Sequence, residues 1–268
     1  MTWIKPPFNY GANKADWSIG DSFLYFAALG KLEGVSSYNK FGENPDIDIT
    51  TVPEDIWDQG GTYTYSTTAD IDTISSSSAL DTGTITVEGL DENWDYILQE
   101  LTLTGQAKVA LTTNLIRCFR MYNTGAADFV GTVYVYVNGD ITDGVPDVGT
   151  TIRAIVINGN NQTLMCIYTV PRNKTAMFLE GYVALSNQKD GGAVFSWRAR
   201  PFGGVFQVKS RLAADSGGSS SWSYKYGMPV VLPEKTDIKV MCDSVTKDNT
   251  AVSGGFDILL FDNTLWDL

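Results

Sequence analysis

Short runs in which apolar and polar residues alternate dominate this chain, and that period of two is typical of half-buried β-strands. Residues 62–67 alternate aromatic and hydroxyl side chains, and residues 83–89 place Ile85 and Val87 on one face. Roughly a dozen such runs lie between residue 60 and the C-terminus, with almost no helical pattern between them. The pattern predicts an all-β protein with an antiparallel β-sandwich or jelly-roll-like body.

Turn-forming residues separate the predicted strands. Residues 158–161 read Asn-Gly-Asn-Asn between two strand-like runs and predict a hairpin, because Asn and Gly tolerate positive φ. The serine-rich residues 75–78 and the Ser/Gly-rich residues 216–221 have little to bury and are expected to form surface loops. No repeat of fixed length occurs, so propeller and solenoid folds lose support.

The first 60 residues differ from the rest. They contain Pro6, Pro7, Pro45 and Pro53, scattered glycines, and one short helical pattern over residues 21–29. Turn signals and short apolar pieces then alternate up to residue 58. We therefore expect residues 1–60 to be an extended N-terminal arm, and residues 61–268 to be the β-sandwich body, either as one sandwich or as two smaller ones.

The net charge of −12 comes entirely from residues 1–115, which hold 17 Asp/Glu and 5 Lys/Arg. An acidic surface repels phosphate backbones, so no nucleic acid is expected as a partner. The N-terminus lacks an apolar signal core and no apolar run of about 18 residues occurs, which predicts no membrane segment and synthesis in a cytoplasm. Cys118, Cys166 and Cys242 are far apart in apolar runs and are expected to be buried free thiols.

The chain contains no histidine. This removes Ser-His-Asp and Cys-His catalysis, imidazole general bases and imidazole zinc sites together. An enzyme of this composition would have to use carboxylates, Lys or Tyr. We expect a protein that is not an enzyme, with no catalytic residue and no cofactor.

Two sets of carboxylates are candidate sites. Asp140, Asp143 and Asp147 share a Gly-containing loop that could hold Ca²⁺, but their spacing does not match an EF-hand, and a solvated turn is the favoured interpretation. Glu100 and Glu180 could form the acid pair of a polysaccharide hydrolase, although both lie within strand-like runs and fit structural roles better. No metal site is predicted.

Aromatic residues suggest a further binding mode. Trp197, Trp222, Tyr224 and Tyr226 could together form a platform for stacking on a sugar. The favoured alternative is that they fill a sandwich core or a contact between subunits.

Two groups of segments carry a family resemblance. The first comprises residues 43–48, 52–58 and 60–63; the second comprises residues 87–91, 100–105, 161–165 and 168–171. Both resemble segments of the virion structural proteins of tailed bacteriophages, over about residues 35–185 of this chain. The resemblance implies a virion component: a head decoration (cement) protein, or a part of the tail or baseplate.

That resemblance and the strand pattern lead to the functional expectation. We expect a capsid decoration protein that docks through its N-terminal arm onto the major capsid protein or neighbouring virion proteins. Exposed strand edges and aromatic residues favour a homo-oligomer, for which a trimer is the preferred state. The alternative is a structural module of the tail or baseplate that contacts a host glycan.

Overall fold

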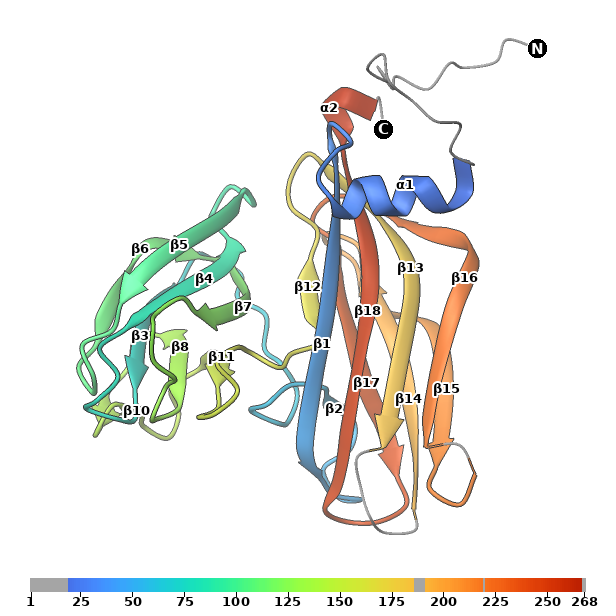
Figure 1. Ribbon diagram of the computed structural model, residues 1–268. Coiled ribbons are helices and arrows are strands. Elements are labelled where there is room, and N and C mark those ends of the chain that lie inside the picture. Colours follow the sequence, from blue (N-terminus) through green and yellow to red (C-terminus); the bar gives the residue numbers. More distant parts are fainter. Residues whose placement is uncertain (1–18, 186–190, 219, 267–268) are drawn as a thin grey trace.

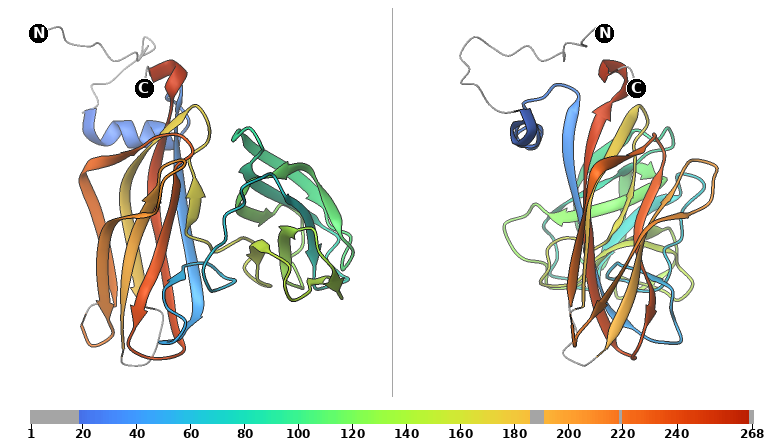
Figure 2. Two further views of the ribbon diagram at one scale, coloured as in Figure 1. Left: turned by 180° about the vertical axis from the view of Figure 1, so that it is seen from behind. Right: turned by 90° about the vertical axis from the view of Figure 1, so that its right-hand side faces the viewer.

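The computed structural model describes residues 19–185, 191–218 and 220–266 and confirms an all-β, sandwich-like protein (Figure 1). The strands form two lobes. The large lobe comprises residues 35–60 and 166–262, and the inserted lobe comprises residues 61–165. The chain leaves the large lobe after its second strand, builds the inserted lobe and then returns, so the large lobe is assembled from both ends of the sequence (Figure 2).

The large lobe is a sandwich of two antiparallel sheets. In spatial order the first sheet contains β1 (Val35–Ile47), β18 (Thr250–Asp262), β13 (Lys174–Leu185) and β16 (Ser221–Leu232). The second contains β12 (Ile167–Thr169), β17 (Asp237–Val245), β14 (Gly192–Arg200) and β15 (Gln207–Asp215), while β2 (Glu54–Asp55) also pairs with β17. Phe178, Phe195, Trp197 and Phe256 are buried in its apolar core.

The inserted lobe repeats this plan at smaller size. One sheet contains β11 (Ile152–Val156), β8 (Val133–Val137), β3 (Ile71–Ser76) and β6 (Val109–Leu115). The other contains β5 (Tyr96–Thr102), β4 (Thr84–Leu90) and β7 (Arg117–Asn123), and a separate short hairpin joins β9 (Ile141–Thr142) to β10 (Val145–Pro146). Its core includes Ile74, Val87 and Val135.

Two short helices lie at one end of the large lobe, α1 (Ile19–Ala28) and α2 (Asn263–Trp266) (Figure 1). The helical pattern expected over residues 21–29 is confirmed by α1. Gly30, with φ of 63°, ends this helix: its N–H donates to the carbonyl of Ala27, and the next N–H, of Lys31, donates to that of Phe26. These two hydrogen bonds form the usual pattern by which a glycine with positive φ terminates a helix.

The expected arm of residues 1–60 is wrong for residues 35–58. Residues 35–47 form β1, which pairs with β18 along most of its length, and residues 54–55 pair with β17. The prolines and glycines of this segment indicated a chain without strand partners. Its strand partners lie in the last 30 residues, far away in sequence. Residues 1–18 lie outside the described part of the chain.

Three local predictions also fail. Residues 62–67 are not a strand, because side chains of other segments satisfy their backbone: Tyr63 N–H donates to Asp55, and the carbonyls of Thr64 and Ser66 accept from Arg153 and Arg117. Residues 158–161 form a turn, but it does not close a hairpin, because the chain after it bridges β7 at Tyr122 instead of pairing back with β11.

The serine-rich residues 75–78 are the third failure, since they are not a surface loop. Ser75 and Ser76 end β3 and are fully buried. The Ser76 hydroxyl donates to Asp81, and the Ser75 hydroxyl donates to the carbonyl of Gly144. Burial of a hydroxyl is tolerated where it is hydrogen-bonded, and composition does not reveal such partners.

Candidate interaction surfaces

The contact between the two lobes fixes how their surfaces are presented. Arg117 on β7 of the inserted lobe forms a buried ion pair with Asp237 on β17 of the large lobe, with Nε 2.8 Å from Oδ1. Asp237 also accepts from Thr169 at 2.6 Å and from Arg200 at 2.5 Å. Leu90, Ile116 and Phe119 of the inserted lobe join the large lobe's apolar core. Polar and apolar contacts together therefore hold the two lobes against each other.

A second polar contact lies deeper between the lobes. The Lys40 ammonium on β1 is fully buried and donates to the carbonyl of Phe119 on β7. Burial, and next the neighbouring Arg120 guanidinium, lower the pKa of Lys40 to about 7. Arg120 also stacks on the Tyr38 ring at 4.4 Å, and the Tyr38 hydroxyl donates to Glu88.

A cavity of about 320 Å³ opens beside the Arg117–Asp237 ion pair and is lined by Tyr65, Trp94, Arg117, Arg200 and Phe202, among others. It was not predicted from the sequence, because its lining comes from both lobes. Both of its arginines donate to Asp237, so their charges already serve the contact between lobes. The buried Tyr65 hydroxyl has no hydrogen-bond partner there among the described residues.

The end of the large lobe that carries α1 presents an apolar surface. One side of the helix packs on a small core that includes Val35, Leu259 and Phe261, and Phe23 stacks on Phe261 at 6.3 Å. The other side leaves Leu24, Tyr25 and Leu29 exposed, and Leu265 of the nearby α2 is exposed as well. We call these four residues the α1 end. Tyr25 and Leu29 are 69% and 67% exposed, so no described residue covers this apolar face.

The side of the large lobe that faces away from the inserted lobe is an open edge of both sheets (Figure 1). β15 and β16 are the last strands of their two sheets, and neither pairs with a further strand in the described part of the chain. We call their exposed side chains the basic edge: Val208, Lys209, Arg211, Trp222, Tyr224, Lys225, Met228 and Val231. Strand edges with exposed apolar residues are surfaces that proteins normally cover.

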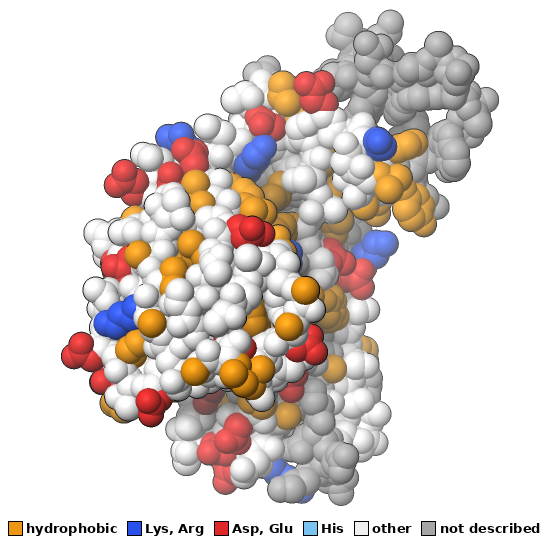
Figure 3. All heavy atoms as spheres, turned by 60° about the vertical axis from the view of Figure 1, so that its left-hand side comes forward, with side chains coloured by type: hydrophobic (Ala, Val, Ile, Leu, Met, Phe, Trp, Pro, Cys, Tyr) orange, Lys and Arg blue, Asp and Glu red, His pale blue; other side chains and the backbone are white. Residues whose placement is uncertain are grey.

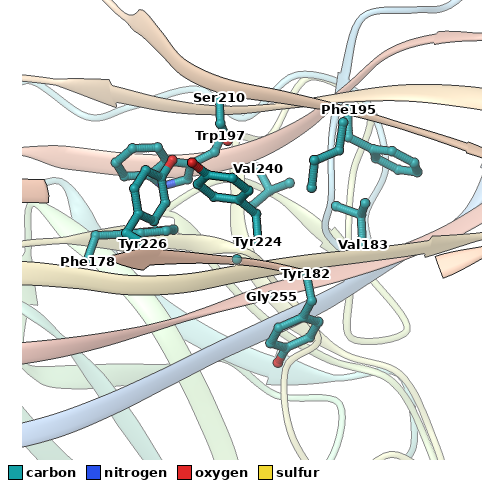
Figure 4. A pocket seen from close by; sticks show the side chains of 12 residues that line it. Phe178, Tyr182, Val183, Phe195, Trp197, Ser210, Tyr224, Tyr226, Val240 and Gly255 are labelled. Carbon is teal, nitrogen blue, oxygen red and sulfur yellow. The ribbon is translucent and has the colours of Figure 1, made fainter. Parts of the chain in front are cut away.

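The structure divides the four residues of the candidate aromatic platform between core and surface. Trp197 is only 5% exposed, and its ring centre lies 3.8 Å from that of Phe178 inside the sandwich. Tyr226 packs against both rings, and Tyr224 lies at the mouth of the groove beside it (Figure 4). The groove encloses only about 20 Å³, which is room for about one water molecule and not for a sugar. Trp222 and Tyr224 alone remain on the surface.

The carboxylate candidates do not assemble into a site. Glu100 is on β5 of the inserted lobe and Glu180 is on β13 of the large lobe, so the structure does not pair them across one sugar bond. Asp140, Asp143 and Asp147 are exposed around the β9–β10 hairpin, where Asp147 accepts from the Thr142 hydroxyl. No group of three or more metal-ligating side chains occurs among the described residues.

Two further sequence expectations can be compared with the structure. Cys118, Cys166 and Cys242 are buried free thiols, as expected, and burial raises the pKa of Cys118 to about 12. Within the described residues, no helix has the length and apolar character needed to span a membrane.

Comparison with known proteins gives only distant matches. No protein-family model matches this chain, and no curated protein matches it. Among solved structures, the PBSX exported protein XepA matches at 10% identity and a TM-score of 0.20, with 83% of this chain and 84% of that chain covered. The VP2 subviral particle of infectious bursal disease virus matches at 10% identity and a TM-score of 0.24, with 88% and 74% covered. TM-scores this low do not establish a common fold.

Proposed function

We propose that this chain is a structural protein of a virus particle: a capsid decoration (cement) protein that docks through its α1 end and associates with further copies of itself. The exposed apolar face of α1 carries the proposal. A helix that packs one side on the protein and leaves Leu24, Tyr25 and Leu29 in water gains free energy when a partner covers that side. The resemblance of residues 35–185 to tailed-phage virion proteins supports the same role.

The proposal names partners that fit this surface. The α1 end would lie on the major capsid protein or a neighbouring virion protein, and a trimer is the favoured state of the chain itself. Residues 1–18 precede α1 and include Trp3, Ile4 and Phe8, so they add apolar side chains to the same end of the sequence. The anchoring segment is therefore residues 1–34, shorter than the arm expected from sequence.

The test is a gel of purified particles followed by rebinding. A decoration protein should approach the major capsid protein in abundance. The variant Tyr25→Ser/Leu29→Ser should bind particles that lack the protein at least tenfold more weakly. The control Leu80→Ser/Val130→Ser removes exposed apolar side chains from the inserted lobe and should bind as the wild type does. Equal binding by both variants would overturn docking through α1.

A tail or baseplate module is the second candidate, and the exposed rings of Trp222 and Tyr224 favour it. Such a module contacting a host glycan should be present in few copies per particle. The same gel therefore separates the two: a weak band relative to the major capsid protein supports the tail position, and a comparable band supports decoration.

A further inference from the structure

The charged side chains are distributed unequally between the two sides of the molecule. The inserted lobe, residues 61–165, holds 12 Asp/Glu and 4 Lys/Arg, a net charge of −8. Two of its four basic residues, Arg117 and Arg153, are buried, and Lys108 is the one basic residue that is fully exposed among those described. Figure 3, which brings this lobe forward, shows acidic side chains around its rim and few basic ones.

The basic edge has the opposite charge. Residues 207–232 hold Lys209, Arg211 and Lys225 against a single acid, Asp215, and all three basic side chains are exposed. Arg211 lies 2.9 Å from Asp243, and Lys225 lies opposite Glu180 of β13 in the sheet register. Lys209 contacts the neutral Gln207, with no acidic partner among the described residues. The edge therefore carries positive charge in a chain whose overall charge is −12.

Exposed apolar side chains accompany the charges on both sides. On the inserted lobe, Val145 and Val148 are exposed between Asp140, Asp143 and Asp147, and we call residues 138–149 the acidic loop. On the basic edge, Trp222, Tyr224 and Met228 are exposed near Lys225. The two surfaces match in composition and are opposite in charge, which is the complementarity that guides protein association.

The two surfaces cannot meet within one molecule. The β9–β10 hairpin of the acidic loop and the strands β15 and β16 lie on opposite sides of the chain, with the large sandwich between them (Figure 1). The buried ion pair of Arg117 with Asp237 and the shared apolar core hold the lobes in that arrangement. A second copy is the partner that brings them together.

We propose that the acidic loop of one copy docks on the basic edge of the next, in a head-to-tail contact. Such an interface joins two different patches, so it closes into a ring or continues as a chain, depending on the rotation between copies. The inference rests on the proposed function in one respect, since it names the surface through which the decoration protein associates with itself. It uses neither the α1 end nor the capsid.

The test measures self-association of the purified full chain by sedimentation and light scattering. Lys209→Glu/Lys225→Glu makes the edge acidic, and Asp140→Lys/Asp143→Lys makes the loop basic; each alone should weaken association about tenfold or more. Lys31→Glu/Lys247→Glu makes the same charge change on exposed lysines outside both surfaces and should associate as the wild type does. Raising the salt should weaken the wild type.

The decisive experiment mixes the two charge-reversed variants. Each variant's altered surface then meets the opposite alteration, and each unaltered surface meets its natural partner, so the mixture should recover association: fully in an open chain or an even-numbered ring, and at two contacts of three in a trimer. An edge-to-edge contact between two basic edges predicts no effect of the loop variant. The proposal is overturned by that result, by a wild type that stays monomeric at about 100 μM, or by a mixture of natively folded variants that does not recover.

The two proposals fail separately. Self-association is measured without particles, so a failed head-to-tail contact leaves the particle-binding result for Tyr25→Ser/Leu29→Ser standing. Failure of the chain to bind particles leaves the sedimentation result standing in turn.

Discussion

Asp237 gathers three donor side chains at the contact between the lobes, and one of them, Arg117, comes from the inserted lobe. It accepts from Arg117, Arg200 and Thr169, and its own side chain is 4% exposed. A buried ion pair adds little net stability relative to apolar residues of the same shape, but removal of one partner leaves a buried charge uncompensated.

The change Asp237→Ala should therefore lower the free energy of unfolding by about 3–5 kcal/mol. Asp95→Ala, which removes the exposed partner of Arg172, is the matched control and should cost no more than about 1 kcal/mol. Urea titrations followed by fluorescence measure both. Equal losses in the two variants would contradict the assignment of Asp237 as the central residue of this contact.

Lys40 makes stability depend on pH. Its pKa is about 7 in the folded protein, below the 10.5 of a free lysine, because burial disfavours the charged ammonium and the Arg120 guanidinium lies near. Between these values the unfolded chain binds more protons than the folded one, so this group's contribution to stability rises as pH rises from about 7 to about 10.

The variant Lys40→Met should remove that dependence. The wild type minus variant difference in unfolding free energy should grow in favour of the wild type from pH 7 to pH 9, by at most roughly 1.4 kcal/mol per pH unit. Taking the difference cancels the titration of tyrosines and cysteines common to both proteins. Parallel curves for the two proteins would show that Lys40 is not buried as a neutral amine.

At the scale of elements, β1 is crossed by the two segments that lead into and out of the inserted lobe. A Cβ on Gly42 would lie 2.6 Å from the Cys166 nitrogen and 2.8 Å from the Ile56 carbonyl oxygen. Cys166 N–H donates to that same carbonyl at 2.8 Å, so the two segments are joined directly beside β1. Only glycine leaves room for this approach, since the neighbouring atoms are backbone.

Gly42→Ala should accordingly destabilise the protein by about 1–3 kcal/mol through overpacking. Gly83→Ala just before β4 is the control, because nothing lies within 4 Å of its added Cβ, and it should stay within about 0.5 kcal/mol. Thermal and urea unfolding measure both variants. A Gly42→Ala protein as stable as the control would mean that the crossing segments move apart at little cost.

On the scale of the whole molecule, the large lobe is built from strands separated by the entire inserted lobe. β1 pairs with β18, and β2 pairs with β17. Both sheets of the large lobe therefore depend on residues 35–58. In the described part of the chain, no residue before Val35 belongs to a sheet.

Deletion of residues 1–60 should therefore yield an unfolded or aggregated chain, because it removes β1 and β2 and exposes the edges of β17 and β18. Deletion of residues 1–18 should leave the melting temperature within a few degrees of the wild type. Circular dichroism and thermal unfolding of the two truncated chains distinguish these outcomes. A cooperatively folded chain after removal of residues 1–60 would contradict the role of β1 in the sheet.

The sequence by itself determined the fold class, a helix over residues 21–29 (observed at 19–28), the burial of the cysteines and the acidic character of the first half. These follow from local patterns: alternation with period two, a glycine after an apolar turn, and composition. Tertiary structure decided the rest. It made β1 a sheet strand, buried Ser75 and Ser76, sent Trp197 inside while Trp222 stayed outside, and separated Glu100 from Glu180. Each of these outcomes depends on a partner distant in sequence, and a single chain read locally carries no record of which distant residues will meet.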